Sequence, residues 1–150
     1  MLGFRWIVRG LFLTVTAVSG AAGAAGPVNI DGSGAAAGGY DVVAYFASGI
    51  AQPGSTEFTA THDGATYRFA SAANLEAFRV APARYVPQYG GYCAYGVAGG
   101  YKAPIDPTAW RVVDGKLYLN YDHEVQRRWL TGTADYIRKA NVNWPAVREK

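Results

Sequence analysis

Two stretches of the chain follow the same plan, in which a tight turn joins two alternating strands and a helix follows. In residues 57–70, apolar and polar side chains alternate on both sides of Asp63-Gly64, a pair suited to the positive φ angles of a hairpin turn. Residues 110–120 repeat this pattern around Asp114-Gly115. The sequence therefore predicts two antiparallel β-hairpins, and no other feature constrains the fold as strongly.

The residues after each hairpin have the signals of a short helix. Ser71 and Asp122 can cap the two helices, because their side-chain oxygens can accept hydrogen bonds from the first-turn N–H groups. Phe78 and Trp129 lie on the apolar stripes that would face the core, and Pro82 ends the first helix.

A third helix is expected from Thr133, its predicted cap, to Asn143. Trp144 precedes Pro145, and the residue before a proline is disfavoured in the helical region. These patterns together predict an α+β fold, with two antiparallel hairpins in a small sheet, a helix after each hairpin, and a C-terminal helix.

The two hairpin–helix segments align without a gap at an offset of 51 residues. One interpretation is an internal duplication, in which two similar units pack on one core. The alternative is that any hairpin followed by a helix requires such residues. The aligned pairs are the two Asp-Gly turns, Tyr67 with Tyr118, Ser71 with Asp122, and Phe78 with Trp129.

The first 24 residues have the pattern of a secretory signal peptide. Arg5 and Arg9 precede the apolar run 11–18, which is too short to span a bilayer, and Ala22-Gly23-Ala24 offers a small-residue cleavage site. The predicted location is periplasmic or secreted, without stable membrane insertion after cleavage; an uncleaved anchor is the alternative.

Residues 25–39 are rich in glycine and alanine, which predicts a flexible linker before a domain of residues 40–150. Asp41 can cap a short helical turn at the start of that domain. Cleavage removes Arg5 and Arg9 but no acidic residue, so the formal charge falls by two, from +3 to +1. Nothing left suggests the clustered basic face of a nucleic-acid-binding protein.

The segment between the two units, residues 85–101, contains the chain's single cysteine, Cys93. A lone cysteine in an exported protein cannot form an internal disulfide, so it is a free thiol, an intermolecular partner or a ligand. Its neighbours combine flexible backbone with aromatic rings that have polar tips, as a binding site would. The candidate ligand-binding neighbours are Tyr89, Tyr92, Tyr95, Gly90, Gly91 and Gly96. The alternative is a small buried cysteine in a protein-interaction or structural module.

His62 and His123 are the other soft or borderline metal ligands of the domain. Together with Cys93 they would make a trigonal site for copper or zinc if the fold brought them together. Each histidine also has an interpretation without a ligand role: His62 as a solvated residue beside a turn, and His123 as a residue of the first turn of a helix.

An enzyme is the third interpretation. No protease-like signature surrounds Cys93, and the glycines form neither a phosphate loop nor a dinucleotide fingerprint. The expectation is therefore a non-enzymatic protein.

The segment DGATYRFASAANLEAFRVAPARY resembles the YHS-domain family. The residues that carry the resemblance are Gly64, Tyr67, Phe69, Ser71, Phe78, Pro82 and Tyr85. The wider chain, from GYDVVAYF through YGGYCAYG to NVNW, is similar to the exported single-domain branch of that family.

The resemblance implies a hairpin with a following helix and an association with metal handling. Many YHS domains carry two cysteines, at the positions of Ala70 and Asn74 here, so that metal site does not transfer. The expected function is an exported, non-enzymatic protein that binds a copper or zinc ion or a small molecule near Cys93. The sequence does not identify a protein partner.

Overall fold

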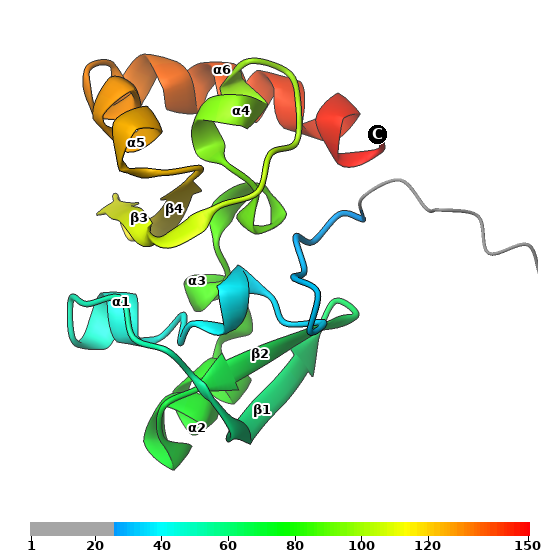
Figure 1. Ribbon diagram of the computed structural model, residues 1–150, viewed down its shortest axis with the longest axis vertical. Coiled ribbons are helices and arrows are strands. Elements are labelled where there is room, and N and C mark those ends of the chain that lie inside the picture. Colours follow the sequence, from blue (N-terminus) through cyan, green and yellow to red (C-terminus); the bar gives the residue numbers. More distant parts are fainter. Residues whose placement is uncertain (1–25) are drawn as a thin grey trace, which may run out of the picture.

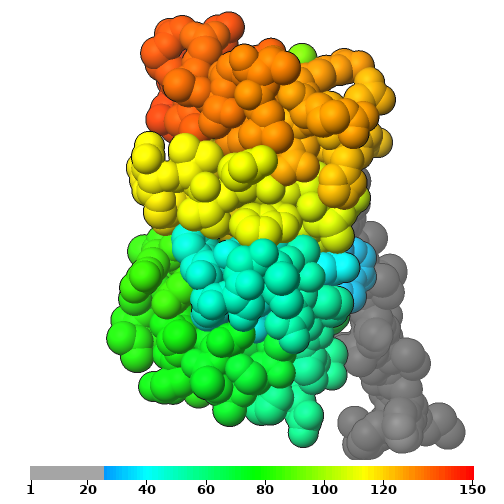
Figure 2. Space-filling model, turned by 90° about the vertical axis from the view of Figure 1, so that its left-hand side faces the viewer, coloured from blue at the N-terminus to red at the C-terminus, as the bar shows by residue number. Residues whose placement is uncertain are grey.

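A computed structural model describes residues 26–150, and Figure 1 shows them as two stacked hairpin–helix units. The first unit comprises residues 37–80 and the second residues 89–131, and a long C-terminal helix packs on the second. In Figure 2 the two halves form two blocks in contact along their whole width. The α+β prediction is confirmed. The predicted signal peptide lies outside the described residues.

The first unit begins with a single 3-10 turn and ends with a helix. Its elements are η1 (Ala37–Gly39), α1 (Ala44–Ala47), β1 (Ser55–His62), β2 (Ala65–Phe69) and α2 (Ala72–Val80).

A short helix, α3 (Pro82–Tyr85), leads to the second unit, which has the same order of elements. They are η2 (Gln88–Gly91), α4 (Ala94–Ala98), β3 (Asp106–Val113), β4 (Lys116–Asn120) and α5 (His123–Leu130), and α6 (Thr133–Arg148) follows them.

The hairpins match each other in turn geometry and in register. Asp63 and Gly64 have φ angles of 49° and 76°, and Asp114 and Gly115 have 50° and 73°, so both turns use two positive φ angles as predicted. The register shifts between Ser55 and Thr59 in one hairpin, and at the same place in the other, between Asp106 and Trp110. A tight turn alone does not require the register to shift at the same place in both hairpins.

The equivalence extends upstream of the hairpins. Ala37, Gly38 and Gly39 have φ angles of 52°, 62° and 77°, and residues 89–91 have 58°, 62° and 79°. The offset in this region is 52 residues, one more than in the hairpins, and it aligns the sequence GGYD with GGYC. Three successive positive φ angles are uncommon, so their recurrence favours the interpretation as an internal repeat.

The predicted caps of α2 and α5 are both present. Ser71 Oγ accepts a hydrogen bond from Asn74 N at 3.1 Å, and Asp122 Oδ1 accepts one from Val125 N at 2.7 Å. The side chains of Phe78 and Trp129 are almost fully buried, as the apolar stripes predicted.

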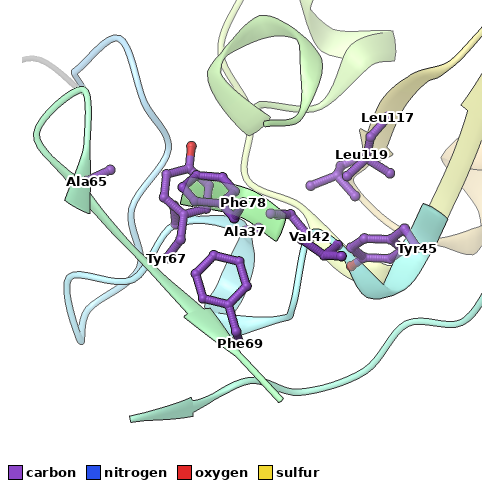
Figure 3. Close-up of a cluster of buried hydrophobic side chains, with 11 residues drawn as sticks. Ala37, Val42, Tyr45, Ala65, Tyr67, Phe69, Phe78, Leu117 and Leu119 are labelled. Atoms are coloured by element: carbon purple, nitrogen blue, oxygen red, sulfur yellow. The ribbon is translucent and has the colours of Figure 1, made fainter. Parts of the chain in front are cut away.

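The apolar core of the first unit is completed by the second. Figure 3 shows Tyr67 and Phe69 against Phe78, with Leu117 and Leu119 of β4 reaching the same cluster from the other unit. The opposite face of β4 presents Tyr118 to Trp129. Because both faces of β4 are buried, the two units form one packed body.

The prediction for the third helix was wrong at both ends. Gly132, not Thr133, is the residue before α6, and the Thr133 hydroxyl donates to Trp129 O instead of capping. The helix also continues through Pro145 to Arg148. Asn143 Nδ2 donates to Val97 O at 3.1 Å and to Ala98 O at 3.0 Å, and Val147 is buried. These tertiary contacts offset the local cost of the proline.

The segment predicted as a flexible linker is packed against the domain over residues 28–39. Ala36 N donates to Thr66 O at 2.9 Å, Asn29 N donates to Gly90 O at 2.8 Å, and Ala35 is buried. Small residues are needed here because the segment covers the edge of β2 at backbone distance. The domain therefore begins before Tyr40.

Between residues 26 and 150, no helix is long and apolar enough to cross a membrane.

Candidate functional site

Cys93 lies immediately before α4 and joins that helix to the end of β4. Its Sγ accepts hydrogen bonds from Gly96 N at 3.4 Å and from Tyr121 N at 3.2 Å, and its S–H faces Asn120 Oδ1 at 3.7 Å. The residue is 1% exposed. The sulfur thus acts as the acceptor that caps the helix.

Asp41 occupies the matching place in the first unit. It is 0% exposed. Its Oδ1 accepts from Val43 N at 2.9 Å and Ala44 N at 3.2 Å, and its Oδ2 accepts from Ala70 N and from Asn74 Nδ2, both at 2.8 Å. The carboxylate joins α1, the end of β2 and α2.

The correspondence between the two acceptors follows the repeat. Asp41 aligns with Cys93 at the offset of 52, and Ala70 aligns with Tyr121 at the offset of 51. Each acceptor accepts a hydrogen bond from the backbone N–H three residues further along the chain, at Ala44 or Gly96. Each also accepts one from the N–H of the first residue after the second strand of its unit. Cys93 therefore does in the second unit what Asp41 does in the first.

The units differ at the fourth partner. The counterpart of Asn74 is Val125, which has no polar group to offer. Where Asn74 closes the first site by bonding to Asp41, Val125 borders a cavity of about 290 Å³. This cavity, called the Cys93 cavity below, is lined by Cys93, Tyr95, Tyr101, Tyr121, Val125 and Arg128.

Electrostatics keep the Cys93 thiol in its neutral form. Burial raises its pKa above the ordinary value, and this effect exceeds the opposing one of the backbone N–H groups of Gly96, Tyr121 and Tyr95. The thiolate is the form that attacks electrophiles and binds metals. The neutral thiol is therefore better suited to forming the floor of a binding cavity than to acting as a nucleophile.

Asn120 is a site residue that the sequence analysis missed. It is 0% exposed, and its Oδ1 accepts from Tyr95 N at 3.2 Å. Its Nδ2 has no hydrogen-bond partner among residues 26–150. The alignment of the two units at the offset of 51 could have identified it, because it pairs this polar residue with Phe69, which is buried in the first unit.

The structure does not bring the three predicted metal ligands together. His62 lies at the end of β1, beside Asp63 and edge-on to the Phe78 ring. His123 lies at the start of α5, where its Nε2 is 2.8 Å from Thr108 Oγ1. Neither histidine lines the Cys93 cavity.

The donors around Cys93 do not fit a copper or zinc ion. Among residues 26–150 there is no group of three His, Cys, Asp or Glu side chains that could hold a metal ion. The single sulfur already accepts two backbone N–H groups, and the charged side chain of the cavity wall is the cation Arg128. Copper and zinc sites need several deprotonated or imidazole ligands.

Of the three tyrosines expected near a ligand, only Tyr95 borders the cavity. The Tyr89 hydroxyl donates to Asn141 Oδ1 at 2.9 Å, which anchors α6, and the Tyr92 hydroxyl donates to Gly26 O at 2.6 Å. Tyr89 and Tyr92 therefore have structural contacts instead.

The glycines permit close approach to the backbone, but the atoms that come close belong to other residues of the chain. A Cβ at Gly90 would lie 1.9 Å from Pro27 O, and one at Gly91 would lie 3.1 Å from Pro87 Cγ. A Cβ at Gly96 would lie 3.1 Å from the ring of Tyr101. Gly96 thus seats one aromatic wall of the Cys93 cavity.

Comparison with known proteins gives no relative for this chain: no family model, no curated protein and no solved structure matches it.

Proposed function

We propose that this protein is a non-enzymatic binding protein that holds a small apolar or aromatic organic molecule in the Cys93 cavity. The observation that carries the proposal is the difference between the two matched sites. In the first unit Asn74 donates a hydrogen bond to the acceptor, whereas in the second unit Val125 offers no donor and lines a cavity beside Cys93. The second site therefore has space for a ligand next to its acceptor.

The walls of the cavity favour a ligand with a flat apolar body. Tyr95, Tyr101 and Tyr121 contribute three aromatic side chains, and aromatic rings stack or meet edge to face. Tyr101 and Tyr121 are each 51% exposed, so their rings stand at the mouth, and covering them would remove apolar area from water. The neutral thiol on the floor accepts an apolar neighbour without the cost of burying a charge.

We further propose that the chain is an exported, YHS-like protein. The positions that carry cysteines in many YHS domains correspond to Ala70 and Asn74, beside Asp41, and their counterparts in the second unit are Tyr121 and Val125. The resemblance therefore concerns the site around Asp41 in the first unit, and only the internal repeat relates those positions to the cavity. Mass spectrometry of the protein from its native host tests export: a chain that starts near Ala24 supports it, and an intact Met1 in the soluble fraction contradicts it.

Binding is tested by NMR titration with two aromatic probes, indole and phenol. We expect amide shifts at residues 93–96, 101 and 121–128. Val125→Phe, which fills the cavity, should abolish them, and Val125→Asn, which reproduces the closed first site, should weaken them. Asn74→Gln is the matched control in the other unit and should leave the shifts unchanged.

Two results would contradict the proposal. If neither probe shifts these amides at about 10 mM, the cavity has no useful affinity for aromatic molecules. If the shifts persist in Val125→Phe, the probes bind elsewhere. Addition of zinc or copper(I) to the wild type and to Cys93→Ser distinguishes the metal alternative, because a metal bound to the sulfur would raise Tm only in the wild type.

A further inference from the structure

A second pocket lies at the junction of the two units, away from Cys93. Its volume is about 430 Å³. The end of β1 forms one wall, the last turns of α6 form another, and the segment that begins at Pro27 closes a third side. The pocket, called the junction pocket below, therefore joins parts of the chain far apart in sequence, and junctions of this kind are common places for ligands.

Tyr67 contributes its hydroxyl to this pocket. The residue is 2% exposed, yet its hydroxyl has no hydrogen-bond partner within residues 26–150. Figure 3 shows the hydroxyl pointing out of the apolar cluster, away from Phe69. Burial, and to a smaller extent the nearby Asp63, raise the pKa of Tyr67 to about 12, so the hydroxyl keeps its proton near neutral pH. The hydroxyl is therefore available to donate a hydrogen bond to a ligand in the pocket.

The charges at the pocket leave one cation available. Arg148 forms no ion pair with any residue of the described part of the chain. Asp63 Oδ2, by contrast, is 3.4 Å from His62 Nε2 and can pair with that ring when it is protonated. A guanidinium binds carboxylates with two parallel N–H groups, and Tyr67 can donate a third hydrogen bond.

The remaining walls are apolar. Trp144 offers an indole ring, and Val28, Val86 and Pro87 contribute aliphatic surface. A ligand that satisfies both parts of the pocket needs an apolar body and one acidic group. A phosphate dianion fits less well, because a single free cation faces it and the carboxylate of Asp63 lies at the rim.

We infer that the junction pocket binds a small organic acid, with its carboxylate held by the Tyr67 hydroxyl and Arg148 and its apolar body against Trp144. The pocket is not repeated in the second unit, where Val113 stands at the position of His62. Tyr118, the counterpart of Tyr67, is 4% exposed and does not line the pocket. This inference is independent of the proposed function of the Cys93 cavity.

The test is an NMR and calorimetric titration of the purified protein with benzoate and indole-3-acetate, each beside its neutral amide. We expect the acids to bind with a Kd of about 1 mM or tighter, and the amides roughly tenfold more weakly. Tyr67→Phe and Arg148→Gln should each weaken acid binding roughly tenfold. Tyr118→Phe and Val125→Phe are the controls, and both should bind the acids like the wild type.

Three results would overturn the inference: no binding of either acid up to about 10 mM, equal binding of acids and amides, or unchanged acid affinity in both Tyr67→Phe and Arg148→Gln. Thermal melts of every variant show whether it is folded. The two substitutions act at different walls, so a folding defect in one leaves the other informative. Loss of acid binding in Val125→Phe would assign the acids to the Cys93 cavity instead.

Discussion

Replacing Cys93 tests whether its sulfur acts as a hydrogen-bond acceptor or as a small apolar group. Cys93→Val keeps an apolar side chain but removes the acceptor for Gly96 N and Tyr121 N. Each buried donor left without a partner costs roughly 1–3 kcal/mol, so the expected loss in free energy of unfolding for the two donors is about 2–6 kcal/mol. Cys93→Ser keeps an acceptor for both groups and can donate to Asn120 Oδ1, so its expected loss is about 1 kcal/mol.

The measurement is urea unfolding followed by tryptophan fluorescence, with the free energy extrapolated to water. Val97 is the matched control, because it lies four residues further along, is 0% exposed and packs in an apolar cluster. There Val97→Ser should cost about 2–3 kcal/mol, since a hydroxyl is buried and apolar contacts are lost. If Cys93→Val proves as stable as Cys93→Ser, the sulfur is not a structural acceptor and the comparison with Asp41 is wrong.

Four further outcomes are expected in the same unfolding assay. Asn74→Ala should cost about 1.5–3 kcal/mol, because Asp41 Oδ2 loses one of its two donors; a loss below about 0.5 kcal/mol would show that the amide is dispensable. Gly64→Val and Gly115→Val should each cost about 1–2 kcal/mol through backbone strain alone, since both have positive φ and no atom within 4 Å of an added Cβ; unequal losses would contradict the equivalence of the turns. Phe78→Ala and Trp129→Ala should each cost about 3–5 kcal/mol; a loss near 1 kcal/mol would remove that residue from the core. Cys93→Asp combined with Val125→Asn should be about 1–2 kcal/mol more stable than Cys93→Asp alone, because the amide supplies the donor that Asn74 supplies to Asp41; no gain from Val125→Asn would contradict the equivalence of the two sites.

Local signals in the sequence were sufficient for the turns, three of the four predicted caps and the buried aromatic residues. Asp-Gly pairs and Ser or Asp caps act over three or four residues, so neighbouring residues determine them. The helix α6 was misjudged because its last turns depend on Asn143 and Val147 packing against α4 and its surroundings. A proline rule describes the isolated helix and omits such contacts.

The packed segment before η1 could not be recognised from composition. Glycine and alanine offer little surface to bury, which is typical of a linker, but small side chains also allow two backbones to meet. Here Ala35 pairs with Thr66, and Ala36 N bonds to Thr66 O. The deciding contacts lie about thirty residues away in the chain, which a local reading of the sequence does not detect.

The equivalence of Asp41 and Cys93 was present in the sequence as GGYD and GGYC, but a gapless alignment at 51 residues does not align them. The first strand of the hairpin begins 14 positions after Asp41 but 13 positions after Cys93, and this difference of one residue changes the offset from 52 to 51. A carboxylate has two oxygens and can accept four hydrogen bonds here, whereas a thiol accepts two, so Asn120 accepts the bond from Tyr95 N. With Cys93 neutral, no amide donor is needed at the position of Val125, and this apolar side chain lines the cavity instead. The exchange of one acceptor thus accounts for Asn120 as the acceptor of the Tyr95 bond and for an apolar residue where the first unit has Asn74.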